Sequence, residues 1–195
     1  MIVITYSAGN LLLSLFLTML ITLILGMGLP TTAAYAISAT MLVPALIKME
    51  VPPLAAHLFV FYFACLSALT PPVAVAAYAA AAIAKAKAWN VGWTATKFAI
   101  AGFIVPYMFV YGPPLLLRGD VSETILAIMT ACIGTCMLSG AVQGWFLKLG
   151  NINYFERATL LVASLLLIKP GWITDMIGLL IFLALFFLHY WKKRS

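Results

Sequence analysis

Long uncharged apolar runs alternate with short polar or basic connections along this chain. Residues 10–47 and 54–84 carry no charged side chain, and both runs are interrupted near their middle by glycine, proline or threonine. A helix that crosses a membrane needs about 20 apolar residues. The pattern therefore predicts membrane-embedded helices, with two of the apolar runs broken at depth.

The first run predicts a re-entrant hairpin. Its interruption reads Gly-Met-Gly-Leu-Pro-Thr-Thr over residues 26–32 and separates an inbound leg at 11–25 from an outbound leg that ends near Leu46. Each leg has about 15 residues and a length of about 22 Å at the helical rise, whereas the hydrocarbon core is about 30 Å thick. Because neither leg is long enough to cross, we expect both to enter and leave on one side.

The second run predicts a helix that is broken at Thr70, Pro71 and Pro72. Two consecutive prolines remove two amide donors, and proline disfavours helical torsions in the residue before it. The alanine-rich sequence at 73–84 allows another helix to approach closely in lipid. An alternative for both runs is a proline kink in an ordinary helical bundle.

About four further membrane segments are expected in the rest of the chain. We predict spans at 99–117, 125–147 and 176–190, a short segment at 158–168, and a short interfacial helix that carries Trp89 and Trp93. The Lys/Arg-rich carboxy terminus and the connection at 85–97 carry the excess of positive charge, so both are predicted to lie on the cytoplasmic side.

Composition supports an all-α integral membrane protein. Hydrophobic residues make up 65% of the chain and charged residues 8%, with a mean hydropathy of +1.13, whereas soluble domains contain about 25% charged residues. The net charge of +6 is spread over the connections and the tail rather than gathered on one face. It therefore predicts membrane topology and no binding of nucleic acid.

The residues of an enzyme active site are not found together in this sequence, and we predict neither an enzyme nor a cofactor. The two histidines, His57 and His189, stand far apart and have no serine or carboxylate at a useful spacing. All five acidic residues fall in predicted connections, so a proton relay inside the membrane has no candidate. This favours sodium over a proton as a coupling ion, although both stay open.

The two broken segments are the candidate site for a cation. Unwound backbone carbonyls and threonine hydroxyls supply the hard oxygen ligands that a dehydrated sodium ion needs, and half-helix amino termini attract anionic groups. Gly26 and Gly28 permit the torsions that expose carbonyls, and Thr31 and Thr70 each stand beside a proline. Two such breaks that meet near the middle of the membrane would form a cation site.

The two sequences GMGLPTTAAYAISATMLVPAL and ALTPPVAVAAYAAAAIA, within residues 10–97, resemble the second half of the large membrane subunit of tripartite ATP-independent periplasmic (TRAP) transporters, most of all the fused permeases of the TAXI branch. The resemblance implies an elevator-type secondary transporter of the bacterial inner membrane, built from inverted repeats of a re-entrant hairpin and a broken helix. Coupling to a cation, usually sodium, would drive uptake of organic anions delivered by a periplasmic solute-binding protein.

The resemblance also implies domains and site residues. Residues 1–97 would be the second-repeat transport module, with the hairpin at 10–47, the broken helix at 54–84 and a cytoplasmic connection at 85–97; residues 98–195 would be a carboxy-terminal transmembrane extension. The implied cation-site residues are Gly26, Gly28, Pro30, Thr31, Thr70, Pro71 and Pro72, with Thr32 and Tyr35 beside the substrate.

The first repeat and the small membrane subunit of such transporters have no counterpart in these 195 residues. We therefore expect the chain to be a carboxy-terminal fragment or a split-gene product that works with a missing amino-terminal permease half or with a small membrane subunit. The alternative functions are a non-transporting membrane interaction or assembly subunit and an inactive truncated remnant.

Overall fold

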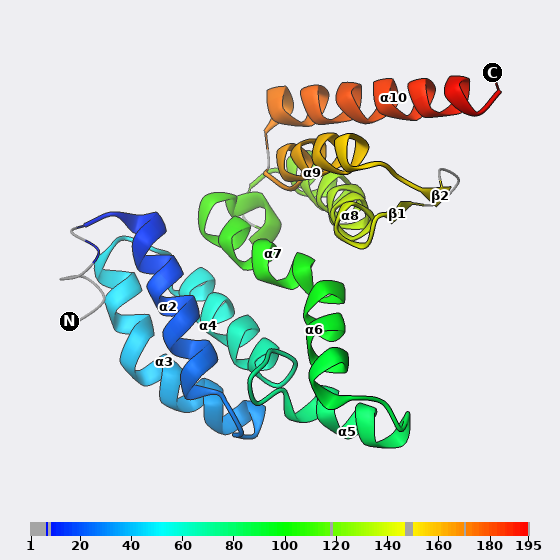
Figure 1. Ribbon diagram of the computed structural model, residues 1–195. Helices are drawn as coiled ribbons and strands as arrows, with labels where there is room; N and C mark the ends of the chain where they lie inside the picture. Colours follow the sequence, from blue (N-terminus) through cyan, green and yellow to red (C-terminus); the bar gives the residue numbers. More distant parts are fainter. Residues whose placement is uncertain (1–6, 8, 118, 147–149, 170, 195) are drawn as a thin grey trace. The chain divides into compact units, whose positions relative to one another are not determined.

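The computed structural model describes residues 7, 9–117, 119–146, 150–169 and 171–194 (Figure 1). The chain divides into two compact units, Met1–Val110 and Tyr111–Ser195. Within the described residues both units are helical apart from one pair of two-residue strands. The prediction of an all-α fold is confirmed.

The first unit begins with the predicted hairpin. Helix α2 spans Leu11–Leu25. Asn10 caps its amino terminus, because the Asn10 side-chain oxygen accepts a hydrogen bond from the Leu13 amide at 3.3 Å. Helix α3 spans Thr31–Lys48 and follows Pro30 directly. The tip therefore covers residues 26–30, two residues less than expected, because Thr31 and Thr32 already belong to α3.

Helix α4, Pro53–Ser67, packs against both legs of the hairpin. Its first residue is a proline, which suits a position where the amide has no helical partner. Phe59, Val60 and Phe63 of this helix have no exposed surface and belong to the buried core. Burial of one such side chain contributes about 1.5–3 kcal/mol in water, and in lipid the same contacts act through close packing.

The predicted break separates α4 from α5, Val75–Ile83. Helix α6, Ala88–Phe98, then leads after Ala99 into α7, Ile100–Tyr111. Helix α7 packs on α4 through aromatic rings: Tyr107 lies edge-on to Phe59 at a centroid distance of 5.2 Å. The predicted helix that carries Trp89 and Trp93 is α6. It leads almost directly into α7, which corresponds to the span predicted to begin near residue 99.

In its described residues, the second unit contains three α-helices, α8 (Val121–Gln143), α9 (Tyr154–Ile168) and α10 (Trp172–Arg194), preceded by a short 3-10 helix, η1, at Pro113–Leu116. Strands β1 (Trp145–Phe146) and β2 (Gly150–Asn151) pair in antiparallel fashion between α8 and α9. Helix α9 packs against both α8 and α10. A Cβ at Gly134 of α8 would lie 2.8 Å from Ile168 of α9, so this helix pair needs glycine there.

The prediction that all five acidic residues lie in connections was wrong, because α8, α9 and α10 each begin four residues earlier than expected. Helix α9 starts four residues before the predicted segment, because Asn153 and Glu156 form a capping box at its amino terminus. Glu156 and Arg157 therefore both lie in the helix. Helix α10 likewise starts before Met176, so Asp175 lies in its first turn rather than in a connection. Glu123 also lies in a first turn, that of α8.

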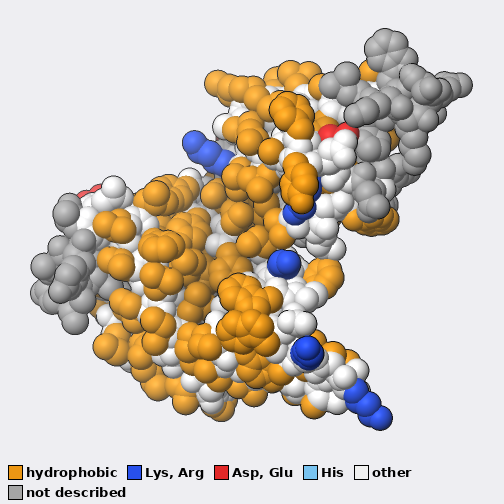
Figure 2. Space-filling view, in the orientation of Figure 1, with side chains coloured by type: hydrophobic (Ala, Val, Ile, Leu, Met, Phe, Trp, Pro, Cys, Tyr) orange, Lys and Arg blue, Asp and Glu red, His pale blue; other side chains and the backbone are white. Residues whose placement is uncertain are grey.

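Three helices of the described residues are long and apolar enough to cross a membrane: Thr31–Lys48, Ala88–Tyr111 and Val121–Gln143. The first of these is the outbound leg of the hairpin, so the expectation that this leg is too short to cross was wrong: it has 18 residues because Thr31, Thr32 and Lys48 belong to the helix. Leu11–Leu25, Pro53–Ser67 and Trp172–Phe187 are shorter apolar helices. Hydrophobic side chains cover most of the described surface visible in Figure 2. This exposure is typical of a protein whose helices contact lipid.

The contact between α8 and α9 gives a first prediction. Replacement Gly134→Leu should lower the thermal stability of the purified protein, because overpacking at a close helix contact costs about 1–3 kcal/mol. The measurement is the temperature at which the protein unfolds or aggregates in mild detergent. Cys132→Leu is the control, since Cys132 is exposed on the same helix; equal losses for the two variants would contradict the assigned contact.

Candidate cation site at the hairpin tip and the broken helix

The hairpin tip is a tight turn that requires glycine. The Gly26 amide bonds to the Thr22 carbonyl at 2.9 Å and closes α2, and the Leu29 amide bonds to the Gly26 carbonyl at 3.2 Å. Gly28 has φ +77°, in the left-handed region that other residues rarely adopt. Pro30 is extended, with φ −58° and ψ 143°, and Thr31 and Thr32 open α3. The first amides of a helix lack helical partners, so the tip presents donors next to both threonines.

The break between α4 and α5 covers residues 68–74. Pro71 and Pro72 have no amide proton, so the carbonyls of Ser67 and Ala68 lose the donors that a continuous helix would provide. The Ala68 carbonyl instead accepts a bond from the Ala76 amide across the break at 3.0 Å. The peptide bond between the two prolines is cis.

Two hydroxyls fix the shape of the break. Thr70 Oγ1 donates to the Leu66 carbonyl at 2.7 Å. Tyr78 Oη, from α5, donates to the Pro72 carbonyl at 2.7 Å. Thr70 therefore has its proton directed back into α4, while the lone pairs of its oxygen remain the part of the hydroxyl that a cation could use.

The tip and the break are in direct contact. Ser67 Oγ lies 3.1 Å from the Gly26 carbonyl and 2.7 Å from the Ala64 carbonyl, so its single proton is shared between the two acceptors. A Cβ at Gly26 would collide with the Ser67 side chain, and one at Gly28 would lie 3.7 Å from Val73. Two interruptions about forty residues apart in sequence thus form one structure.

Helix α6 supports the break from another side. A Cβ at Gly92 would lie 3.1 Å from the Tyr78 ring and 3.2 Å from Pro71, so a larger residue there would press on both side chains. Thr96 Oγ1 lies 3.0 Å from the Gly92 carbonyl and 3.5 Å from the Leu69 carbonyl. The first half of the helical stretch Ala88–Tyr111 therefore packs directly against the break.

The structure brings some of the predicted residues together. Gly26 lies against Ser67 and Gly28 lies near Val73, whereas Pro71 lies beside Gly92 of α6. Tyr35 points to a different partner, since its hydroxyl lies 2.8 Å from Nδ1 of His57 on α4 and its ring lies edge-on to Phe61. The role of each residue in binding a cation or a substrate stays a prediction.

Sequence reasoning missed Ser67, the side chain that joins the two interruptions. Ser67 is buried, 2% exposed, at the last position of α4. Its signal was a serine three residues before Thr-Pro-Pro in a mostly apolar helix, but nothing local indicated that its partner would be Gly26. His57 was seen in the sequence without its partner Tyr35 for the same reason.

The tip and the break offer uncharged oxygen atoms as ligands. Among the described residues there is no group of three or more His, Cys, Asp or Glu side chains that could hold a metal ion. At the tip and the break, the available oxygens are those of backbone carbonyls and of hydroxyls, which suit a hard monovalent cation.

These features define a helical, multi-pass membrane protein with a hairpin packed on a broken helix. Residues 1–124 match the family described as tripartite ATP-independent periplasmic transporter, DctM component, and residues 124–178 match DUF3394, a domain of unknown function. No curated protein and no solved structure matches the chain significantly. Since the first match covers more than half of the chain, this protein belongs to the DctM family of TRAP transporter permeases.

The contact between Gly26 and Ser67 gives a second prediction. Gly26→Ala should lower thermal stability and expose the tip to protease, because its new methyl group collides with Ser67. The double variant with Ser67→Gly should recover part of the loss, since the second change removes the colliding atoms. Additive losses in the double variant would show that the two residues do not meet.

Proposed function

We propose that the first unit forms part of the transport domain of a cation-coupled permease that takes up organic anions in the bacterial inner membrane. The observation that carries the proposal is the contact of the hairpin tip with the helix break through Ser67, in a chain of the DctM family. The oxygens at this contact would hold sodium, and the free amides at the start of α3 would attract the anionic substrate.

The proposed partners follow from the family. A periplasmic solute-binding protein would deliver the anion, and a second membrane chain would supply the other half of the substrate cavity. The role of this chain would then be to bind the coupling ion and to close its side of the cavity. Coupling to sodium is proposed over coupling to a proton, because the tip and the break are built without a carboxylate.

The proposed ion site gives a third prediction. Thr70→Val and Gly28→Leu should each abolish the stabilisation of the purified assembly by sodium chloride relative to potassium chloride. The valine removes an oxygen ligand, and the leucine cannot adopt φ +77° without strain. Bound sodium raises the melting temperature by mass action, so the difference between the two salts measures binding.

Thr40→Val is the matched control for this experiment. Thr40 is an exposed threonine of α3 whose hydroxyl bonds to the Ile37 carbonyl at 2.9 Å, more than two turns from the tip. It should keep the full response to sodium. A response that survives in Thr70→Val and Gly28→Leu would place the ion elsewhere.

The proposed partnership gives a fourth prediction. A tag at the carboxy terminus at the native locus should recover this sequence in mild detergent together with another membrane protein, or within a chain much heavier than 21.1 kDa. A periplasmic binding protein should be recovered in the same preparation after cross-linking. Recovery of the chain alone at 21.1 kDa would contradict the transport proposal and favour the non-transporting alternative.

A further inference from the structure

A cavity in the second unit has no part in the proposed cation site. Its volume is about 230 Å³, which is several times the volume share of one water molecule. It lies where η1, the start of α8 and the start of α10 come together. The side chains that matter for its chemistry are Tyr111, Glu123, Leu126, Ala127, Trp172 and Asp175.

Two carboxylates line this cavity. Glu123 lies in the first turn of α8 and Asp175 in the first turn of α10. An acidic side chain near a helix amino terminus is stabilised by the helix dipole, and this accounts for Glu123, which is exposed. The dipole does not account for Asp175, because that residue is only 8% exposed.

Asp175 is incompletely paired. A hydrogen bond from the backbone of Gly171 reaches its carboxylate, while Oδ1 has no hydrogen-bond partner among the described residues. An ionised carboxylate has about four acceptor positions, and a buried charge without a partner is costly. The described side chains around the cavity include no lysine or arginine that could neutralise it.

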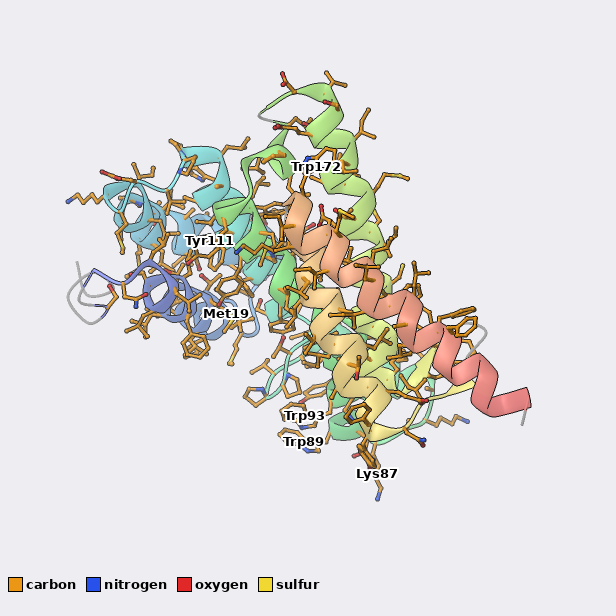
Figure 3. The ribbon with its side chains drawn as sticks, turned by 90° about the horizontal axis from the view of Figure 1, so that it is seen from above. Met19, Lys87, Trp89, Trp93, Tyr111 and Trp172 are labelled. Carbon is orange, nitrogen blue, oxygen red and sulfur yellow. The ribbon has the colours of Figure 1, made fainter. Side chains whose placement is uncertain are left out.

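The other lining groups are complementary to a cation with an organic body. Tyr111 and Trp172, both labelled in Figure 3, present partly exposed rings, at 45% and 73%. The faces of such rings attract ammonium and guanidinium groups. Leu126 and Ala127 add apolar surface. Two carboxylates are too few for a calcium ion, which takes six to eight oxygen ligands, and the cavity is larger than a bare ion requires.

We propose that this cavity binds a small organic cation, with an ammonium or guanidinium group held between Glu123 and Asp175 and its carbon atoms against Tyr111 and Trp172. The proposal concerns only residues of the second unit and does not rest on the transport function proposed for the first. It assigns a ligand site to the stretch around the DUF3394 match, to which Asp175 belongs.

The test uses the full chain in lipid nanodiscs and choline as the probe, with binding measured by isothermal titration calorimetry. Choline should bind, whereas its uncharged analogue, in which carbon replaces the ammonium nitrogen, should bind at least roughly tenfold more weakly, as expected for the loss of the electrostatic attraction to the two carboxylates and to the ring faces. Glu123→Gln and Trp172→Leu should each weaken choline binding, and Asp175→Asn should weaken it most.

Asp120→Asn is the matched control, because Asp120 is an exposed carboxylate three residues from Glu123 that does not line the cavity. It should leave choline binding unchanged. Glu123→Gln keeps the test decisive if Asp175→Asn fails to fold, since Glu123 is exposed. No binding of choline, equal binding of the uncharged analogue, or unchanged binding in Glu123→Gln would each overturn the proposal.

Discussion

The need to pair every backbone polar group in lipid governs this structure. An unpaired amide or carbonyl in hydrocarbon costs several kcal/mol, so a helix can break at depth only if other groups replace the lost bonds. Here the replacements are local: the Ala76 amide reaches Ala68, the Thr70 hydroxyl reaches Leu66, and the Tyr78 hydroxyl reaches Pro72. The carbonyl of Ser67 has lost the helical donor that a residue other than Pro71 would provide.

The hairpin and the break could be predicted because glycine and proline act on the backbone of their own positions. The bounds of α2 agree with the sequence at both ends, and α4 and α5 end and begin on either side of Pro71 and Pro72. The contact through Ser67 could not be predicted, because it depends on how helices distant in sequence pack. The same holds for Tyr35, whose bond to His57 only the pairing of α3 with α4 creates.

Charged residues mark helix starts in the second half, where the sequence pattern predicts connections. Glu156 and Arg157 both lie in the first turn of α9 and not in a turn between spans. Arg157 donates to the carbonyls of Ala141 and Val142 at 2.9 and 2.7 Å, and so satisfies the carboxy-terminal end of α8. Arg157, which the sequence pattern places in a connection, thus caps the carboxy-terminal end of α8 from its position in α9. The two family matches also meet at residue 124, inside α8, so the DUF3394 stretch shares a continuous helix with the DctM stretch.

The shared proton of Ser67 determines what separation of the tip from the break would cost. If the two moved apart, Ser67 would keep the Ala64 carbonyl as its acceptor, and the Gly26 carbonyl would keep the Leu29 amide as its donor. No polar group would be stranded in lipid, and the loss would be about one net hydrogen bond, or 0.5–1.5 kcal/mol. Hydrogen bonding therefore opposes separation at this junction only weakly, whereas each helix on either side of it is held by its own ladder of backbone hydrogen bonds.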